Sequence, residues 1–316
     1  MTSWSRERAR RLRRTALIAG LATAAVVVVA VMASSAPATQ GSAAAAGATP
    51  VAEATVPALD PARFATGACL AYAPTHGDRM QTVFLDAGHG GPDPGGVGVT
   101  EAGRTLHERD MTLPVVAKAA TLLRAAGFRV VVSRTTNGPV ANPGPGDLTG
   151  GIFTPAGLHR DVAARATCAN LGKADALVSV HYNVGASPKN AGVMTVYDAS
   201  RPFSAQNLQL ATLVQDNIIK QLHAHPDWDV PDVGVVKDGA DGNALTAAGE
   251  AYGHLLILGP AKAGYFDTPS RMPGALVEPL FLTDPFEGTL AASPPGQLAI
   301  ATGIADAVEQ FLTPSG

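Results

Sequence analysis

The sequence predicts an α/β fold: a single domain with a twisted, mostly parallel central sheet and helices on both of its faces. Short runs rich in β-branched residues alternate with longer segments whose apolar residues recur at helical spacing. This alternation is typical of parallel strands joined by crossover helices. It fills one stretch of ordinary domain length, because the first fifth of the 316 residues lacks any such pattern.

The expected elements follow one another from residue 82 to residue 312. We predict strands at 82–86, 129–133, 176–180, 193–197 and 274–278, and helices at 109–126, 158–171, 205–222 and 297–312. The first helix shows apolar residues at helical spacing and ends at Gly127, a residue type that commonly terminates helices. The strand at 82–86 leads into a glycine-rich turn at 87–98.

Two stretches without periodicity are expected to be loops, at residues 137–155 and 224–249. The first is rich in glycine and proline and is either a binding loop or a passive surface excursion. The second carries the aspartates Asp227, Asp229, Asp232, Asp238 and Asp241. Their spacing matches no calcium-loop pattern, which favours a solvated turn region over a calcium site.

The N-terminus has the features of an export signal. Six arginines between residues 6 and 14 precede an apolar run from Thr15 to Ala33, and the small residues 33–36 resemble a processing site. We expect residues 1–36 to be a cleaved signal peptide, with an uncleaved N-terminal anchor as the alternative. Residues 37–79 are expected to form a flexible spacer and lead-in rich in Ala, Thr and Pro, and residues 80–316 the catalytic domain. The protein is then exported, and is secreted, associated with the cell wall or anchored in the membrane.

Charge and cysteine content narrow the class of protein. A net charge of -3 with 16% charged residues gives no broad basic surface, so we expect no nucleic-acid partner. The two cysteines, Cys69 and Cys168, suit an oxidising compartment. They form either one bridge or two separate buried thiols, and the sequence leaves both alternatives open.

Three segments place metal-binding residue types at or near the ends of expected elements. His89 lies in Asp-Ala-Gly-His-Gly-Gly after the first strand, Glu108 opens the first helix, and His181 follows an apolar strand. Each has an ordinary explanation: a turn residue, an acid favoured by the helix dipole, or a hydrogen-bonded histidine at a strand end. Together, two histidines and one carboxylate are a known catalytic zinc set with a fourth position for water.

These motifs resemble those of the zinc-dependent N-acetylmuramoyl-L-alanine amidases of the amidase-3 family. The family pattern reads Asp-x-Gly-His-Gly-Gly, a glutamate opening the first helix, Ser-x-His-x-Asn, and a late apolar-Glu-x-x-Phe, and the resemblance covers residues 82–312. It implies that His89, Glu108 and His181 bind Zn²⁺ and that Glu278 is the catalytic acid/base. Zinc would lower the pKa of bound water to about 7. Glu278 would accept that proton and return it to the departing alanine nitrogen.

Some assignments near the motifs stay open. Glu101 and His107 compete with Glu108 as the ligand near the first helix, and the family pattern favours Glu108. Asp86 is either an acid that orients a ligand imidazole or a plain strand-end residue. The late motif has Leu280 where the family usually has glycine, so the backbone after Glu278 is expected to differ.

The resemblance implies a peptidoglycan hydrolase that cleaves the amide bond between N-acetylmuramic acid and L-alanine of the stem peptide. The alternatives are a catalytically silent wall-binding or regulatory protein on the same fold and a zinc peptidase acting within the stem. We expect peptidoglycan or muramyl peptides as partners, membrane contact only through an uncleaved N-terminal segment, and a monomer.

Overall fold

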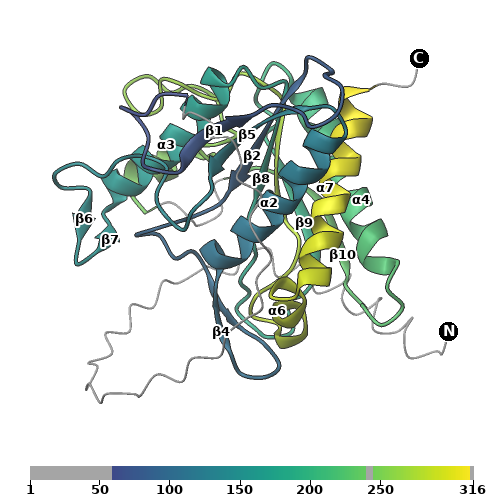
Figure 1. Ribbon diagram of the computed structural model, residues 1–316. Helices are drawn as coiled ribbons and strands as arrows, with labels where there is room; N and C mark the ends of the chain where they lie inside the picture. The colour runs from purple at the N-terminus through teal and green to yellow at the C-terminus, as the bar shows by residue number, and fades with distance from the viewer. Residues whose placement is uncertain (1–58, 240–244, 314–316) are drawn as a thin grey trace, which may run out of the picture.

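The computed structural model describes residues 59–239 and 245–313, in which helices pack on both sides of a central sheet (Figure 1). The sheet has seven strands in the order β1-β5-β2-β8-β11-β9-β10. These strands are β1 (Ala68–Tyr72), β2 (Thr82–Ala87), β5 (Arg129–Arg134), β8 (Ala176–Val180), β9 (Val193–Tyr197), β10 (Asp232–Lys237) and β11 (Gly274–Glu278). The expected export segment, residues 1–36, lies outside the described residues.

Strand direction decides which ends of the strands lie together. β5, β2, β8 and β11 are parallel neighbours, whereas β1 runs antiparallel to β5 and β9 antiparallel to β11. β10 is parallel to β9. The sheet is therefore mixed but mostly parallel, and the predicted fold class is confirmed. The carboxyl ends of β2, β8 and β11 meet at one edge of the sheet, and those of β9 and β10 lie at the opposite edge.

Four long helices cover the two faces of the sheet. α2 (Glu108–Ala125), α4 (Ser204–His223) and α7 (Pro294–Leu312) pack together over one face, where the larger apolar cluster is buried. α3 (Pro155–Leu171) covers the other face with the second cluster (Figure 1). Each long helix lies where the helical spacing of apolar residues predicted one, within a few residues at its ends.

Several short strands and helices lie in segments where the sequence predicted a loop or no regular element. The hairpin β3 (Val97–Val99) and β4 (Thr105–His107) leads directly into α2, and β6 (Leu148–Thr149) pairs with β7 (Ile152–Phe153) inside the predicted 137–155 loop. β10 occupies part of the predicted 224–249 loop, where the expectation of an irregular region was wrong. Two further short helices are α5 (Ala247–Tyr252) and α6 (Pro285–Ala291).

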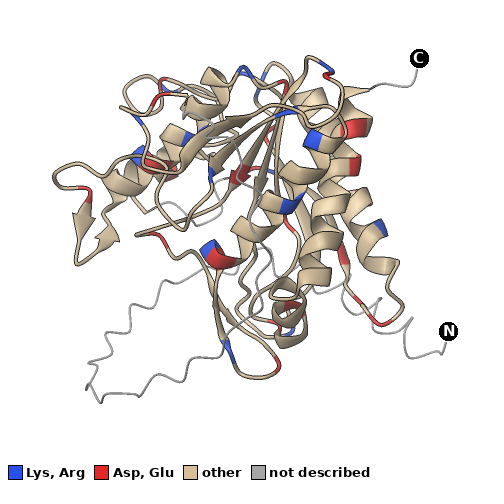
Figure 2. Cartoon of the chain, viewed as in Figure 1, with Lys and Arg blue, Asp and Glu red and all other residues tan. Residues whose placement is uncertain are grey.

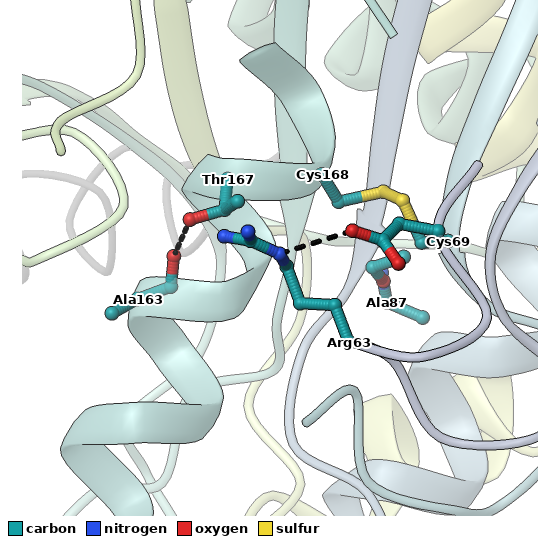
Figure 3. Close-up of a disulfide and its surroundings, with 8 residues drawn as sticks. Arg63, Cys69, Ala87, Ala163, Thr167 and Cys168 are labelled. Carbon is teal, nitrogen blue, oxygen red and sulfur yellow. Dashed lines mark hydrogen bonds and ion pairs between the residues drawn. A yellow bond between two sulfur atoms is a disulfide. The ribbon is translucent and has the colours of Figure 1, made fainter. Parts of the chain in front are cut away.

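A disulfide connects the edge of the sheet to the helix on its second face. Cys69 on β1 and Cys168 on α3 are both fully buried and bonded to each other, with their Cα atoms 5.6 Å apart (Figure 3). Of the two alternatives left open by the sequence, the structure therefore has the bridge. β1 belongs to the lead-in segment, so the folded sheet begins before residue 80.

Figure 2 shows that basic and acidic residues are both spread over the helices and loops of the described part of the chain. Among the helices of residues 59–239 and 245–313, none is both long enough and apolar enough to span a bilayer.

Candidate active site

The loop after β2 presents His89 in a conformation that depends on neighbouring glycines. His89 itself has a φ of 60°, in the left-handed region that non-glycine residues rarely adopt and that often marks functional sites. A Cβ atom on Gly88 would lie 2.4 Å from the His181 ring, and one on Gly95 would lie 2.7 Å from the His89 ring. Glycine at these two positions is what lets the two imidazoles approach each other.

A buried arginine on α3 holds this loop in place. Arg165 on α3 donates hydrogen bonds to the carboxylate of Asp86, to the carbonyl oxygen of Ala87 and to the carbonyl oxygen of His89, at 2.6–2.7 Å. Arg165 and Asp86 are both almost completely buried. Because a buried charge needs a partner, this pair holds the end of β2 and the His89 turn in one position.

The three predicted ligands come together at the carboxyl edge of the parallel strands. His89 Nε2 lies 3.0 Å from Glu108 Oε2, and His181 Nδ1 lies 3.0 Å from Glu108 Oε1. The two histidine nitrogens are 3.1 Å apart. One ligand atom from each residue lies within 4.8 Å of the other two, so the three side chains can share one cation. The His₂Glu set is one that catalytic zinc sites use.

Backbone and glycine contacts orient the shared carboxylate. Glu108 is the first residue of α2 and is buried. Its Oε1 accepts a hydrogen bond from the backbone N–H of Tyr182 at 2.9 Å, and its Oε2 accepts one from the N–H of Gly96 at 2.8 Å. The side chain is therefore fixed by the segment that follows His181 as well as by the β3 loop. A buried carboxylate held in this way is preorganised to face both imidazoles.

The acid that orients His89 is Asp93, which the sequence motifs did not single out. Asp93 Oδ2 lies 2.7 Å from His89 Nδ1, which leaves Nε2 directed at Glu108. Asp86, considered for this role from the sequence, accepts hydrogen bonds from Arg165 and Ser179 instead. The signal for Asp93 was present as an acid four residues after the histidine in the same glycine-rich turn.

The electrostatics of the site favour positive charge between the ligands. Burial alone lowers the pKa of His89, but the negative charges of Glu108 and Asp93 raise it to about 10. Burial likewise raises the pKa of Glu108, and the two imidazoles outweigh it, so that this pKa falls well below its usual range. The raised pKa of His89 shows that the two acids around it stabilise positive charge at this ring. The donor set therefore fits a divalent ion.

Glu278 ends β11 at the same edge of the sheet as the three ligands. Its Oε2 is buried and has no hydrogen-bond partner among the described residues. Burial, reinforced by the negative charge of Glu108 and opposed by His89, raises the pKa of Glu278 well above its ordinary value. An unpartnered buried carboxyl group with a raised pKa, at the same edge of the sheet as His89, Glu108 and His181, is suited to moving a proton.

The segment after Glu278 is held by a second missed residue. Glu287 on α6 accepts a hydrogen bond from the backbone N–H of Phe281 at 2.6 Å, and Asn183 pairs with the same segment through the N–H of Leu282 at 2.8 Å. These contacts anchor the turn that contains Leu280. Glu287 is also buried, and burial raises its pKa to about 8.

The two sequence competitors for Glu108 lie elsewhere. Glu101 is exposed at the tip of the β3–β4 hairpin, and the side chain of His107 on β4 is outside the ligand group. Among the residues that the structure describes, the carboxylate that joins His89 and His181 is Glu108.

The chain matches known proteins over most of the described region. The family model described as N-acetylmuramoyl-L-alanine amidase matches residues 83–310. The germination-specific N-acetylmuramoyl-L-alanine amidase of Bacillus subtilis is 28% identical over 234 residues, which are 74% of this chain and 81% of the relative.

Solved structures give the same family likeness. The crystal structure of an N-acetylmuramoyl-L-alanine amidase from Clostridium difficile 630 has a TM-score of 0.51 and 26% identity, and the match covers 75% of this chain and 98% of that one. The CwlD amidase of Clostridioides difficile, solved in complex with the GerS lipoprotein, has a TM-score of 0.55 over 73% of this chain and 98% of its own, and at 21% identity it supports the fold alone. The chain therefore belongs to the N-acetylmuramoyl-L-alanine amidase family of peptidoglycan hydrolases, which cleave the bond between N-acetylmuramic acid and L-alanine.

Proposed function

We propose that His89, Glu108 and His181 bind one Zn²⁺ ion and that Glu278 is the catalytic acid/base of the amidase reaction. The observation that carries the proposal is the convergence of His89, Glu108 and His181, in which every pair of residues has ligand atoms 3.0–3.1 Å apart. The unpartnered carboxyl oxygen of Glu278 lies at the same edge of the sheet. Bound zinc supplies Lewis acidity, which lowers the pKa of water and stabilises a developing oxyanion.

The protein's own residues supply the proton transfers. An amide nitrogen must be protonated before it leaves, because an amide anion is a very poor leaving group. Glu278 accepts the proton of the attacking water and then delivers it to the nitrogen of the departing L-alanine. The raised pKa of Glu278 suits this cycle, since the carboxyl group must release the proton as readily as it takes it up. The positive charge of a bound ion would lower the pKa of Glu278 again, so that the carboxylate form is populated at neutral pH.

The hydrogen bonds around the ligands keep the site in one geometry during this cycle. Asp93 holds the proton on His89 Nδ1, so that Nε2 stays free to bind the ion. Tyr182 and Gly96 hold the Glu108 carboxylate through their backbone N–H groups. Rigid ligands of this kind avoid reorganisation when charge develops on the substrate carbonyl.

We also propose the location of the active domain. Residues 1–36 act as the export segment, cleaved or retained as an anchor, and residues 37–79 contain the spacer that separates it from the catalytic domain of residues 80–316, together with the edge strand β1. The enzyme acts outside the cell on peptidoglycan or muramyl peptides as a monomer. The disulfide supports an oxidising compartment.

The test is digestion of purified peptidoglycan with analysis of the products by mass spectrometry. The proposal predicts intact N-acetylmuramic acid and complete stem peptides with free L-alanine amino termini, whereas a peptidase would leave L-alanine bound to the sugar. Chelation abolishes the activity and added Zn²⁺ restores it. Glu278→Ala is inactive, and the control Glu101→Ala, which alters an exposed glutamate of the β3–β4 hairpin, keeps full activity. Digestion by the chelated enzyme or by Glu278→Ala would contradict the mechanism.

A further inference from the structure

A second group of potential metal ligands lies outside the active site. Asp198, Asp238 and His254 each direct one ligand atom into a common space, with all three atoms within 4.8 Å of one another. We propose that these three residues bind a second divalent cation of the zinc class, at the edge of the sheet opposite the active site.

Strand direction places this group away from the catalytic residues. Asp198 directly follows β9, and Asp238 directly follows β10. The two parallel strands end side by side, because the backbone N–H of Asp238 donates to the carbonyl oxygen of Tyr197 at 2.7 Å. Glu278 at the end of β11 pairs with Met194 near the start of β9. The length of β9 therefore separates Glu278 from Asp198.

The third ligand comes from the segment between β10 and β11. α5 ends at Tyr252 and is capped by Gly253, whose φ of 74° lets the chain turn sharply before His254. The N–H of Leu255 donates to Asp238 Oδ2 at 2.8 Å, which holds His254 over the two strand ends. The imidazole also packs edge-on against Tyr252, with the ring centroids 5.3 Å apart.

The distances in this group resemble those of the active-site triad. His254 Nδ1 lies 2.7 Å from Asp198 Oδ2 and 3.9 Å from Asp238 Oδ2. Ligand atoms bonded to one zinc ion at about 2.0–2.2 Å lie no more than about 4.4 Å apart, so both separations are compatible with a shared ion. In the active site the corresponding separations between His and Glu ligand atoms are 3.0 Å.

Two ligand atoms in the group are buried and lack a hydrogen bond. Asp198 has no exposed surface, and its Oδ2 is without a hydrogen-bond partner among the described residues, as is His254 Nδ1. The two atoms are close but are not aligned as donor and acceptor, which is the arrangement expected of two ligands directed at a third atom. The other oxygen of Asp198 is satisfied, because it accepts from the N–H and the hydroxyl of Ser200 at 2.7 and 2.5 Å.

Among the described residues, no lysine or arginine forms an ion pair with Asp198 or Asp238, and the basic group in contact with them is the His254 imidazole. Burial, and then the negative charge of Asp198, raise the pKa of Asp238 to about 6, against the opposing effects of the Leu255 N–H and His254. Arg201 interacts electrostatically with Asp198, but its guanidinium donates hydrogen bonds to the carbonyl oxygens of Leu258, Gly259 and Ser270. A divalent cation would neutralise both carboxylates and satisfy the two unpartnered atoms.

The ligand types indicate which cation fits. An imidazole with two carboxylates suits Zn²⁺ and similar transition metals. Calcium requires six to eight oxygen ligands, whereas this group consists of one imidazole and two carboxylates. The ion would connect the segment containing α5 to the ends of β9 and β10, so its effect is on stability and not on the amide chemistry. Asp238 belongs to the acidic stretch for which the sequence favoured a solvated turn, yet its carboxylate is largely buried here.

The proposal is tested by counting zinc ions. The full chain is stripped of metal, equilibrated with Zn²⁺ by dialysis and analysed by inductively coupled plasma mass spectrometry. We expect two zinc ions per wild-type chain, one in Asp198→Asn and one in His254→Ala. The control Asp227→Asn changes an exposed acid of the same stretch and should keep two. Two ions in both Asp198→Asn and His254→Ala, or a single ion in the wild type that His89→Ala abolishes, would overturn the proposal.

Circular dichroism and thermal midpoints control for loss of folding and distinguish the effects of the two sites. Circular dichroism establishes that each variant is folded, and His254→Ala, whose side chain is about one quarter exposed, is the milder change if Asp198→Asn does not fold. The thermal midpoint of His89→Ala should still rise when Zn²⁺ is added, because its second site is intact, whereas that of His89→Ala/His254→Ala should not change. Peptidoglycan digestion by His254→Ala should equal that of the wild type. Failure of the active-site assignment would leave these zinc-dependent midpoints unaffected, so the two proposals fail separately.

Discussion

Replacing Asp93 by asparagine tests how the protein controls the ring of His89. Asp93 Oδ2 lies 2.7 Å from His89 Nδ1, and Oδ1 accepts the N–H of Gly95 at 3.1 Å. A carboxylate only accepts, so the proton stays on Nδ1 and Nε2 is free to bind a metal. Asparagine keeps the shape but replaces one oxygen by an NH₂ group. If the NH₂ group faces His89, it donates to Nδ1 and favours the tautomer with the proton on Nε2. If it faces Gly95, it meets the backbone N–H, which is also a donor.

The expected decrease in zinc affinity follows from the loss of one hydrogen bond to an ionised group. Such a bond contributes about 1.5–3 kcal/mol, which corresponds to a decrease in zinc affinity of roughly 10- to 150-fold. This range agrees with the roughly 10- to 100-fold effect of changing residues that orient metal ligands. Competition titration of Zn²⁺ against a chromophoric chelator measures the affinity directly.

Two controls make this experiment decisive. Asp216→Asn alters an exposed acid on α4 and should leave zinc affinity unchanged. Urea unfolding of the metal-free proteins measures separately how much the ion pair between Asp93 and His89 contributes to stability. A zinc affinity of Asp93→Asn within threefold of the wild type would refute the reasoning.

Three further predictions concern the acid/base, the bridge and the glycine turn. Glu278→Gln should lower the rate of peptidoglycan cleavage by about 10²- to 10⁴-fold with unchanged zinc affinity, and a rate within tenfold of the wild type would contradict its role. Replacing Cys69 and Cys168 by alanine should lower the free energy of unfolding in urea by up to about 4.7 kcal/mol for a bridge that spans 99 residues; a loss below about 1 kcal/mol would show that loop closure contributes little. Gly88→Ala places a Cβ 2.4 Å from the His181 ring, so dialysis should show loss of active-site zinc, and retained stoichiometry would disprove the steric argument.

The parts of the fold that the sequence predicted are those whose burial leaves a periodic pattern. β2, β8 and β11 are buried along their length and appear as apolar runs, and the long helices carry apolar residues at helical spacing. β10 was missed because it is a half-exposed edge strand whose sequence begins and ends with charged residues. β1 was missed because it adjoins a compositionally simple segment, and its place in the sheet depends on pairing with the distant β5.

In the candidate site, too, residues in local motifs could be predicted, whereas contacts between distant segments could not. His89, Glu108, His181 and Glu278 were predicted because each lies at the end of an element in a recognisable motif. Arg165 pairs with Asp86, which is far away in the chain. Glu287 anchors Phe281 across a turn. Neither contact leaves a pattern in the sequence. The group of Asp198, Asp238 and His254 could not be predicted, because it requires knowing that β9 and β10 are parallel and adjacent.

The most direct measurement of the active-site assignment is anomalous diffraction at the zinc edge from crystals of the zinc-loaded protein. The account predicts a peak bonded at about 2.0–2.2 Å to His89 Nε2, a Glu108 carboxylate oxygen and His181 Nδ1, beside the carboxyl group of Glu278. A zinc peak that lacks any one of these three ligands, or loaded crystals without a peak between them, would contradict it.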